Sequence, residues 1–134
     1  QPAQLLADKE VALTTAWSGR IQTAISEEKK PFAVVWDGQA LDFNSWAIPR
    51  GAKNLDASYA FIAFASDAEV MATQSKVSAY GPANTDAMTF IAPEVAATLP
   101  TSPDHMGNPL VYDVGFWGAN GEALTLSFNN WLAQ

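Results

Sequence analysis

The sequence predicts a folded α/β protein. Short apolar segments with strand character alternate with longer segments that have helical periodicity and capping residues. The chain has 134 residues, of which 49% are hydrophobic and 16% are charged, and this composition is typical of globular proteins. The sequence contains no internal repeat and no low-complexity segment. We therefore expect one folded unit with strands and helices in alternation.

The first part of the chain is expected to contain two helices and two strands. Residues 4–9 have the pattern of a helix end that leads into an apolar strand over residues 11–16. Ser18 can cap a helix that runs to about residue 28. Residues 32–36 predict a second strand, which a turn at Asp37 and Gly38 would close.

The next segment predicts a sharp junction between a strand and a helix. An extended run over residues 42–48 ends at Pro49, which has no N–H for a sheet, and Gly51 permits a turn. Asn54 can then cap a helix, and Asp56 would lie near the positive end of its dipole. By its spacing alone, such a junction fits any α/β protein equally well.

The rest of the chain is expected to be mostly helical. Residues 57–65 are apolar on nearly every side, which predicts a largely buried helix. Ser66 and Glu69 have the spacing of a capping box for a further helix to about residue 77. Pro93 opens a short helix. A final helix is expected to bury one apolar face, formed by Trp117, Leu124, Phe128 and Trp131.

Charge is distributed unevenly along the chain. All seven Lys and Arg residues lie between Lys9 and Lys76, whereas residues 77–134 contain five acids and no basic side chain, a formal charge of −5. Nucleic acid is not expected as a partner, because phosphate binding requires clustered Lys and Arg. An acidic face attracts cationic solutes such as polyamines, although a solvated surface explains the same acids more simply.

Several kinds of chemistry have no support in the sequence. There is no cysteine, and the single histidine, His105, lies in a Pro-rich loop without a second transition-metal ligand nearby, so it is expected to be an exposed loop residue and no metal or cofactor is expected. Ser18 lacks the surroundings of a nucleophile elbow, and no glycine-rich phosphate loop occurs. We therefore expect a protein that is not an enzyme.

Blocks of sequence along the whole chain resemble, in order, the C-terminal part of the extracellular solute-binding proteins of ABC transporters, with greatest similarity to the spermidine/putrescine-binding branch. The junction segment from Trp46 to Asn54, which runs into the apolar residues 55–65, resembles the hinge of these receptors. The other blocks are Val11 to Arg20, Tyr80-Gly-Pro-Ala-Asn84, Phe116-Trp-Gly-Ala-Asn120 and Phe128 to Leu132.

The resemblance implies a fold and a division of the chain. It implies the C-terminal portion of a two-lobed type II periplasmic-binding-protein fold, with the N-terminal part of the parent protein absent. Residues 1–42 and 89–134 would then belong to the second lobe. Residues 43–88 would form the hinge strand and a helical segment of the first lobe.

Two candidate binding residues lie at the end of a predicted strand. In open α/β sheets, ligands bind outside the carboxyl ends of strands, where loops meet helix N-termini, and Trp17 and Ser18 occupy such a position. The resemblance implies that Trp17 contacts the ligand. An indole face can stack on an alkyl or cationic chain, with a cation–π attraction of about 0.5–2 kcal/mol. A tryptophan of the core is the alternative.

The hinge strand supplies three more candidates. In polyamine receptors this strand carries an aromatic residue followed two residues later by a carboxylate, and the resemblance aligns Asp42 with the aromatic and Asn44 with the carboxylate. Asn44 cannot supply a negative charge, so either Asp42 replaces it or the solute is not a polyamine. Trp46 would face the same side in a regular strand, as a cleft residue or as a buried residue of the hinge.

Tyr80 resembles another cleft residue of the family, where a phenol combines stacking with a hydrogen bond; turn packing is the alternative. Trp117 fits the wall of a cleft, but the core of the last helix is the better explanation.

The function implied is that of the receptor of an ABC importer, which binds a small polar or cationic, polyamine-like solute between its lobes and presents it to a membrane permease. The localisation would be periplasmic or extracellular. A sensory or interaction module on the same fold is the alternative. Because cleft and sheet would be incomplete, we expect this chain to associate with itself or with the missing N-terminal portion.

Overall fold

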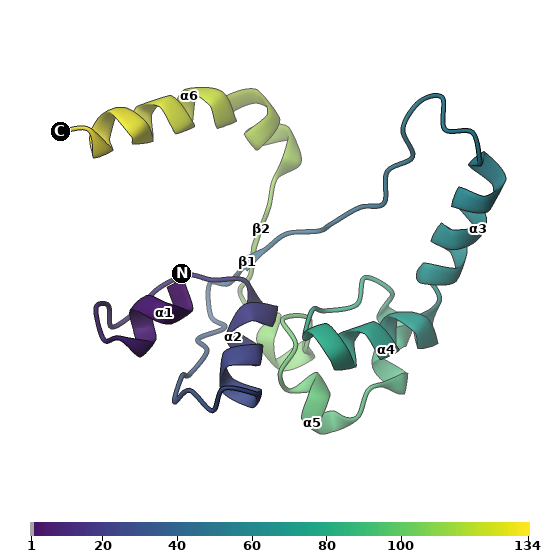
Figure 1. Cartoon of the computed structure of the whole chain (residues 1–134), viewed down its shortest axis with the longest axis horizontal. Coiled ribbons are helices and arrows are strands. Elements are labelled where there is room, and N and C mark those ends of the chain that lie inside the picture. Colours follow the sequence, from purple (N-terminus) through teal and green to yellow (C-terminus); the bar gives the residue numbers. More distant parts are fainter. Residues whose placement is uncertain (1) are drawn as a thin grey trace.

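The computed structural model describes residues 2–134, which form separate helices around one short parallel strand pair (Figure 1). Helices α2, α4 and α5 lie together, whereas α3 and α6 extend away from them on long connections. The α-helices are α1 (Pro2–Ala7), α2 (Ser18–Ser26), α3 (Leu55–Ala65), α4 (Ala68–Ser78), α5 (Pro93–Ala96) and α6 (Val114–Leu132). The strands are β1 (Ala40–Leu41) and β2 (Leu110–Val111), and the 3₁₀ helices are η1 (Thr85–Phe90) and η2 (Pro103–His105).

Strands β1 and β2 pair in parallel, with Ala40 opposite Leu110. The N–H of Leu110 donates to the Gln39 carbonyl at 2.8 Å, and the N–H of Tyr112 donates to the Leu41 carbonyl at 2.9 Å. Parallel strands require a long crossover connection, and here the crossover contains α3, α4, η1 and α5. The pairing therefore connects two distant parts of the chain.

Side chains reinforce this pairing just before each strand. The amide Nε2 of Gln39 donates to the carbonyls of Pro100 at 2.9 Å and His105 at 3.0 Å. The amide of Asn108 donates to the Asp37 carboxylate at 3.0 Å. We refer to these contacts of Gln39 and Asn108 as the polar clamp. Since each strand has only two residues, the clamp supplies much of what holds the crossing segments together.

The strands predicted at residues 11–16 and 32–36 are wrong, because both segments are irregular. A strand is stable only when its backbone groups pair with a neighbour, and within residues 2–134 neither segment has one. Apolar side chains of the two segments are exposed as a result: Leu13 and Val35 lie on the surface. The turn predicted after residue 36 does form, with Gly38 at a φ of 70°, a left-handed conformation that suits glycine.

Two helix starts differ from the predictions. The N-cap of α2 is Trp17, one residue before the predicted Ser18, and its side chain makes no capping hydrogen bond. The cap of α4 is Asp67, whose Oδ1 accepts from the N–H of Glu69 at 2.9 Å, so the predicted Ser66 capping box is wrong. Carboxylates at this position also interact favourably with the helix dipole. Asn54 does occupy the N-cap of α3, but its side chain makes no capping bond.

The core is small and joins α4 to the segment that follows it. Its buried residues Ala72, Ala87, Ile91 and Leu99 come from α4, from η1 and from the residues flanking α5. Two of the four are alanines, Ala72 of α4 and Ala87 of η1, and their small side chains allow these two helices to approach closely. Leu99 is 0% exposed and is the largest fully buried side chain among the described residues.

Helices α3 and α6 form where predicted but are not buried. Neither contains a buried residue, and Tyr59, Phe61 and Phe64 of α3 are all exposed. The expectations of a largely buried helix over residues 57–65 and of a buried apolar face on the last helix are therefore wrong for this chain. The reason is geometric: the sheet described within residues 2–134 has two strands of two residues each, which is too small to cover the apolar side of either helix.

We predict that Leu99→Ala lowers the free energy of unfolding by about 2–4 kcal/mol, because it removes the central side chain of the core and leaves a cavity. Urea denaturation followed by circular dichroism measures the change. Leu13→Ala is the matched control, since Leu13 is 79% exposed. Equal effects of the two substitutions would contradict this description of the core.

Candidate functional site

The first turn of α2, which Trp17 precedes as the N-cap, lies close to the end of α4 and to Tyr80. The Ser18 hydroxyl lies 3.5 Å from the carbonyl oxygen of Ala79, the residue before Tyr80. Ala79 itself ends α4 in the left-handed conformation, with a φ of 51°, which turns the chain back toward α2. We call the side chains of Trp17, Ser18 and Tyr80 the aromatic corner.

Gly19 makes this close approach possible. A Cβ atom at this position would lie 2.6 Å from the carbonyl oxygen of Ser78 and 2.9 Å from Cε2 of Tyr80. Both distances are shorter than real side chains tolerate, so only glycine fits while Tyr80 keeps its place. The sequence contained the Ser-Gly pair, but nothing in it pointed to Tyr80 as the neighbour.

Trp17 is not a core residue, because 66% of its surface is exposed. Its backbone carbonyl accepts the first hydrogen bonds of α2, from the N–H groups of Arg20 and Ile21, which fixes the position of its Cα. An exposed indole held at a helix start is available to stack on a small molecule. Tyr80 is 42% exposed, and its ring lies close to Gly19, two residues after Trp17.

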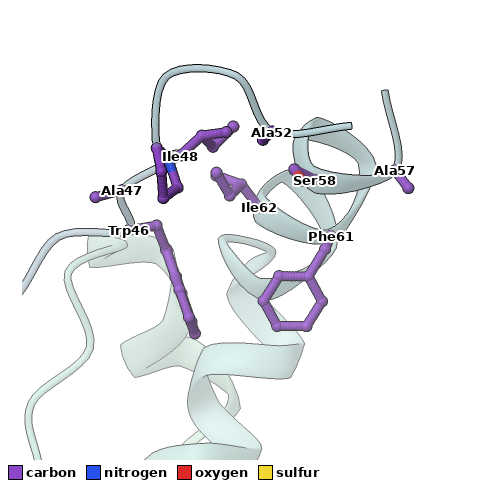
Figure 2. Close-up of a pocket in the computed structure, with 9 residues that line it drawn as sticks. Trp46, Ala47, Ile48, Ala52, Ala57, Ser58, Phe61 and Ile62 are labelled. Carbon is purple, nitrogen blue, oxygen red and sulfur yellow. The ribbon is translucent and has the colours of Figure 1, made fainter. Parts of the chain in front are cut away.

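Asp42 and Trp46, both predicted from the hinge strand, line two different grooves. Asp42 lies beside β1 and β2, in a groove of about 370 Å³ that also involves the first turn of α6. Trp46 lines a groove of about 360 Å³ between the junction segment and α3, where its ring meets Phe61 edge-on at 5.1 Å (Figure 2). Asn44 contributes to neither groove.

Asp42, Asn44 and Trp46 do not line one common groove because residues 42–48 do not form the regular strand that was expected. The strand ends at Leu41, and the following residues are irregular up to the turn at Gly51, whose φ is 86°. Without a strand, side chains two residues apart need not share a face. The prediction that Asp42, Asn44 and Trp46 face one side is therefore wrong, whereas the turn at Gly51 is confirmed.

His105 is half-buried, so the prediction of an exposed loop residue is wrong. Its ring stacks on Trp36 with 4.4 Å between ring centroids and 15° between planes. Its Nδ1 lies 2.7 Å from the Leu99 carbonyl oxygen, which identifies Nδ1 as the protonated nitrogen that donates. Among residues 2–134, no group of three His, Cys, Asp or Glu side chains could hold a metal ion.

Comparison with known proteins shows which protein family this chain belongs to. The family model of the bacterial extracellular solute-binding proteins matches residues 1–103. The chain belongs to this family. One relative is a protein of Pseudomonas aeruginosa described as a gamma-aminobutyric acid-binding protein. It is 35% identical to this chain over 134 residues, which are 100% of this chain and 38% of the relative.

Two solved structures of receptors have the same arrangement of elements. The periplasmic binding protein AgtB from A. tumefaciens, in complex with agropinic acid, has a TM-score of 0.73 and 29% identity over 98% of this chain. A receptor for GABA has a TM-score of 0.79 and 25% identity over 96% of this chain. These similarities confirm the α/β class and the periplasmic-binding-protein fold.

The chain spans well under half the length of these relatives, since it covers 42% of AgtB and 39% of the GABA receptor. The relatives are described as binding proteins or as a receptor. The family is extracellular by its description. In residues 2–134, no helix combines the length and apolarity that crossing a membrane requires.

We predict that Gly19→Ala destabilises the chain by about 1–3 kcal/mol, because the added methyl group displaces Tyr80 or the end of α4. Gly118→Ala is the matched control: Gly118 lies inside α6 with open space around it, so alanine should stabilise by about 0.5–1 kcal/mol. Thermal unfolding measures both changes. A stabilising Gly19→Ala would show that α2 and Tyr80 are not in contact.

Proposed function

We propose that this chain is part of a receptor of an ABC importer, which binds a small polar solute between two lobes and presents it to a membrane permease. The observation that supports it most is the aromatic corner: an exposed Trp17 at the start of α2, whose first turn lies close to Tyr80 at the end of α4. Membership of the extracellular solute-binding family supports the same function and a periplasmic or extracellular localisation.

The solute we propose is a small molecule with an amino group, of the size of 4-aminobutyrate. Two relatives are described by their binding of this compound, and agropinic acid in the third is also a small polar molecule. A polyamine is the second candidate, favoured by the absence of basic residues from the C-terminal half of the chain. Asn44 weighs against it, because this residue stands where polyamine receptors have a carboxylate.

The division between two lobes is also part of the proposal. Residues 1–42 and 89–134 are proposed for the second lobe, and residues 43–88 for the first. The core connects Ala72 to Ile91 and Leu99, on both sides of that boundary, so a boundary nearer to β2 agrees better with the packing. The exposed apolar sides of α3 and α6 would then pack against other parts of the receptor or against a second copy of the chain.

A thermal-shift screen of the receptor that contains this chain tests the proposed function. The panel comprises 4-aminobutyrate, putrescine, spermidine, neutral amino acids and organic anions. A solute present at 100 times its dissociation constant stabilises by about 2.7 kcal/mol, which gives a measurable rise in Tm. No shift with any small polar solute would contradict the proposal, and a shift with spermidine alone would favour the polyamine branch.

We predict that Trp17→Ala weakens binding of 4-aminobutyrate with only a small loss of stability, because the exposed indole contributes stacking and little core packing. Calorimetric titration gives the affinity, and a thermal melt without solute gives the stability. Trp131→Ala is a control, since Trp131 is 63% exposed near the end of α6. Equal affinity of Trp17→Ala and the unmodified receptor would remove Trp17 from the site.

A further inference from the structure

The groove beside the strand pair lies outside the aromatic corner and is lined by its own polar and aromatic side chains. It lies at the carboxyl ends of β1 and β2, where α6 begins. Because the strands are parallel, Asp42 after β1 and Asp113 after β2 reach the same edge. The remaining wall combines three aromatic side chains, from Tyr112, Phe116 and Trp117, with aliphatic side chains of the two strands. None of the residues that line it is basic.

The aromatic wall is ordered by contacts within the chain. The rings of Tyr112 and Trp117 are parallel to within 4°, with 5.8 Å between centroids, and Phe116 meets Trp117 edge-on at 5.7 Å. The backbone N–H of Tyr112 is bonded to Leu41 of β1, and that of Trp117 to the Asp113 carbonyl. Tyr112 and Trp117 remain 43% and 41% exposed, so their faces are available to a ligand.

The two carboxylates are also held in place. Oδ1 of Asp42 accepts from the N–H of Phe43 at 2.8 Å, and Oδ1 of Asp113 accepts from the N–H of Phe116 at 2.9 Å. Asp113 therefore caps α6, and the positive end of the helix offsets part of its charge. Asp42 has no helix dipole of this kind beside it, so the groove keeps a net negative charge.

We propose that this groove binds the ammonium end of the solute, an inference that rests on the proposed receptor function. A primary ammonium is attracted both to carboxylates and to the faces of tyrosine and tryptophan, whereas the two aspartates repel a carboxylate. The groove volume of about 370 Å³ leaves room for an aminoalkyl chain. Asp42 and Asp113 together supply the negative charge that Asn44 cannot.

Asp113→Asn tests the proposal without removing the helix cap, because asparagine caps helices as well as aspartate does. In calorimetric titrations at low ionic strength, we expect this variant to bind 4-aminobutyrate about three- to tenfold more weakly. Binding of 4-hydroxybutyrate, which has a hydroxyl in place of the ammonium, should change by less than about twofold. The double variant Asp42→Asn, Asp113→Asn should lose more affinity for 4-aminobutyrate than either single variant.

Asp86→Asn is the control for net charge, since it removes one carboxylate from η1, outside the groove. It should leave both affinities unchanged. The proposal is overturned if Asp113→Asn binds 4-aminobutyrate as the unmodified receptor does, or if it loses equal affinity for the hydroxyl analogue. It is also overturned if the receptor binds other solutes of the thermal-shift panel but no amine, an outcome that leaves the receptor function intact.

Discussion

The parallel pairing of β1 with β2 is the constraint on which the rest of the structure depends. Two residues on each side make few hydrogen bonds, and a short isolated pair is marginal in water. The polar clamp adds what the strands lack: the Gln39 amide contacts Pro100, which lies 61 positions later in the chain, and His105 as well. Stacking of Trp36 on His105 closes the same region.

This pairing determines where the long helices depart and which side chains meet. The chain leaves β1 toward α3 and leaves β2 directly into α6, so the carboxyl ends of both strands lie at one edge. Asp42, Asp113 and the aromatic residues of the first turn of α6 meet there as a consequence. The aromatic corner has a different origin, because it depends on the left-handed Ala79 and on the missing side chain of Gly19. The proposed binding function therefore rests on two local arrangements with separate physical causes.

Sequence patterns predicted some local features correctly. The capping position of Asn54, the turn at Gly51 and the proline at the start of α5 follow from backbone chemistry that a few neighbouring residues determine. The helix that became α3 was also predicted, but its burial was not. Burial depends on which surfaces the rest of the fold provides, and residues 2–134 provide no sheet for α3. The strand expected at residues 11–16 does not form for a related reason, since residues 2–134 provide no neighbouring strand for it to pair with.

Long-range features of the site could not be predicted in this way. The contact between Gly19 and Tyr80 and the meeting of Asp42 with Asp113 involve residues far apart in sequence, and no periodicity encodes them. The resemblance to solute receptors singled out Trp17, Ser18 and Tyr80, whose role in binding stays a prediction, and the structure brings the first turn of α2 close to Tyr80. The resemblance did not identify Tyr112 or Asp113. A signal was present in the run Tyr112-Asp113 before an aromatic-rich helix start, where an aspartate is a natural N-cap.

Amide hydrogen exchange, measured residue by residue by NMR, tests the dependence on the strand pair most directly. The N–H groups of Leu110 and Tyr112 bond to β1 and should exchange much more slowly than in an unstructured peptide. Gln39→Ala removes the clamp donor and should speed exchange at both amides, while the amide of Met71 inside the core region keeps its protection. Rapid exchange of Leu110 and Tyr112 in the unmodified protein would contradict the account, because the two crossing segments would then not be held together.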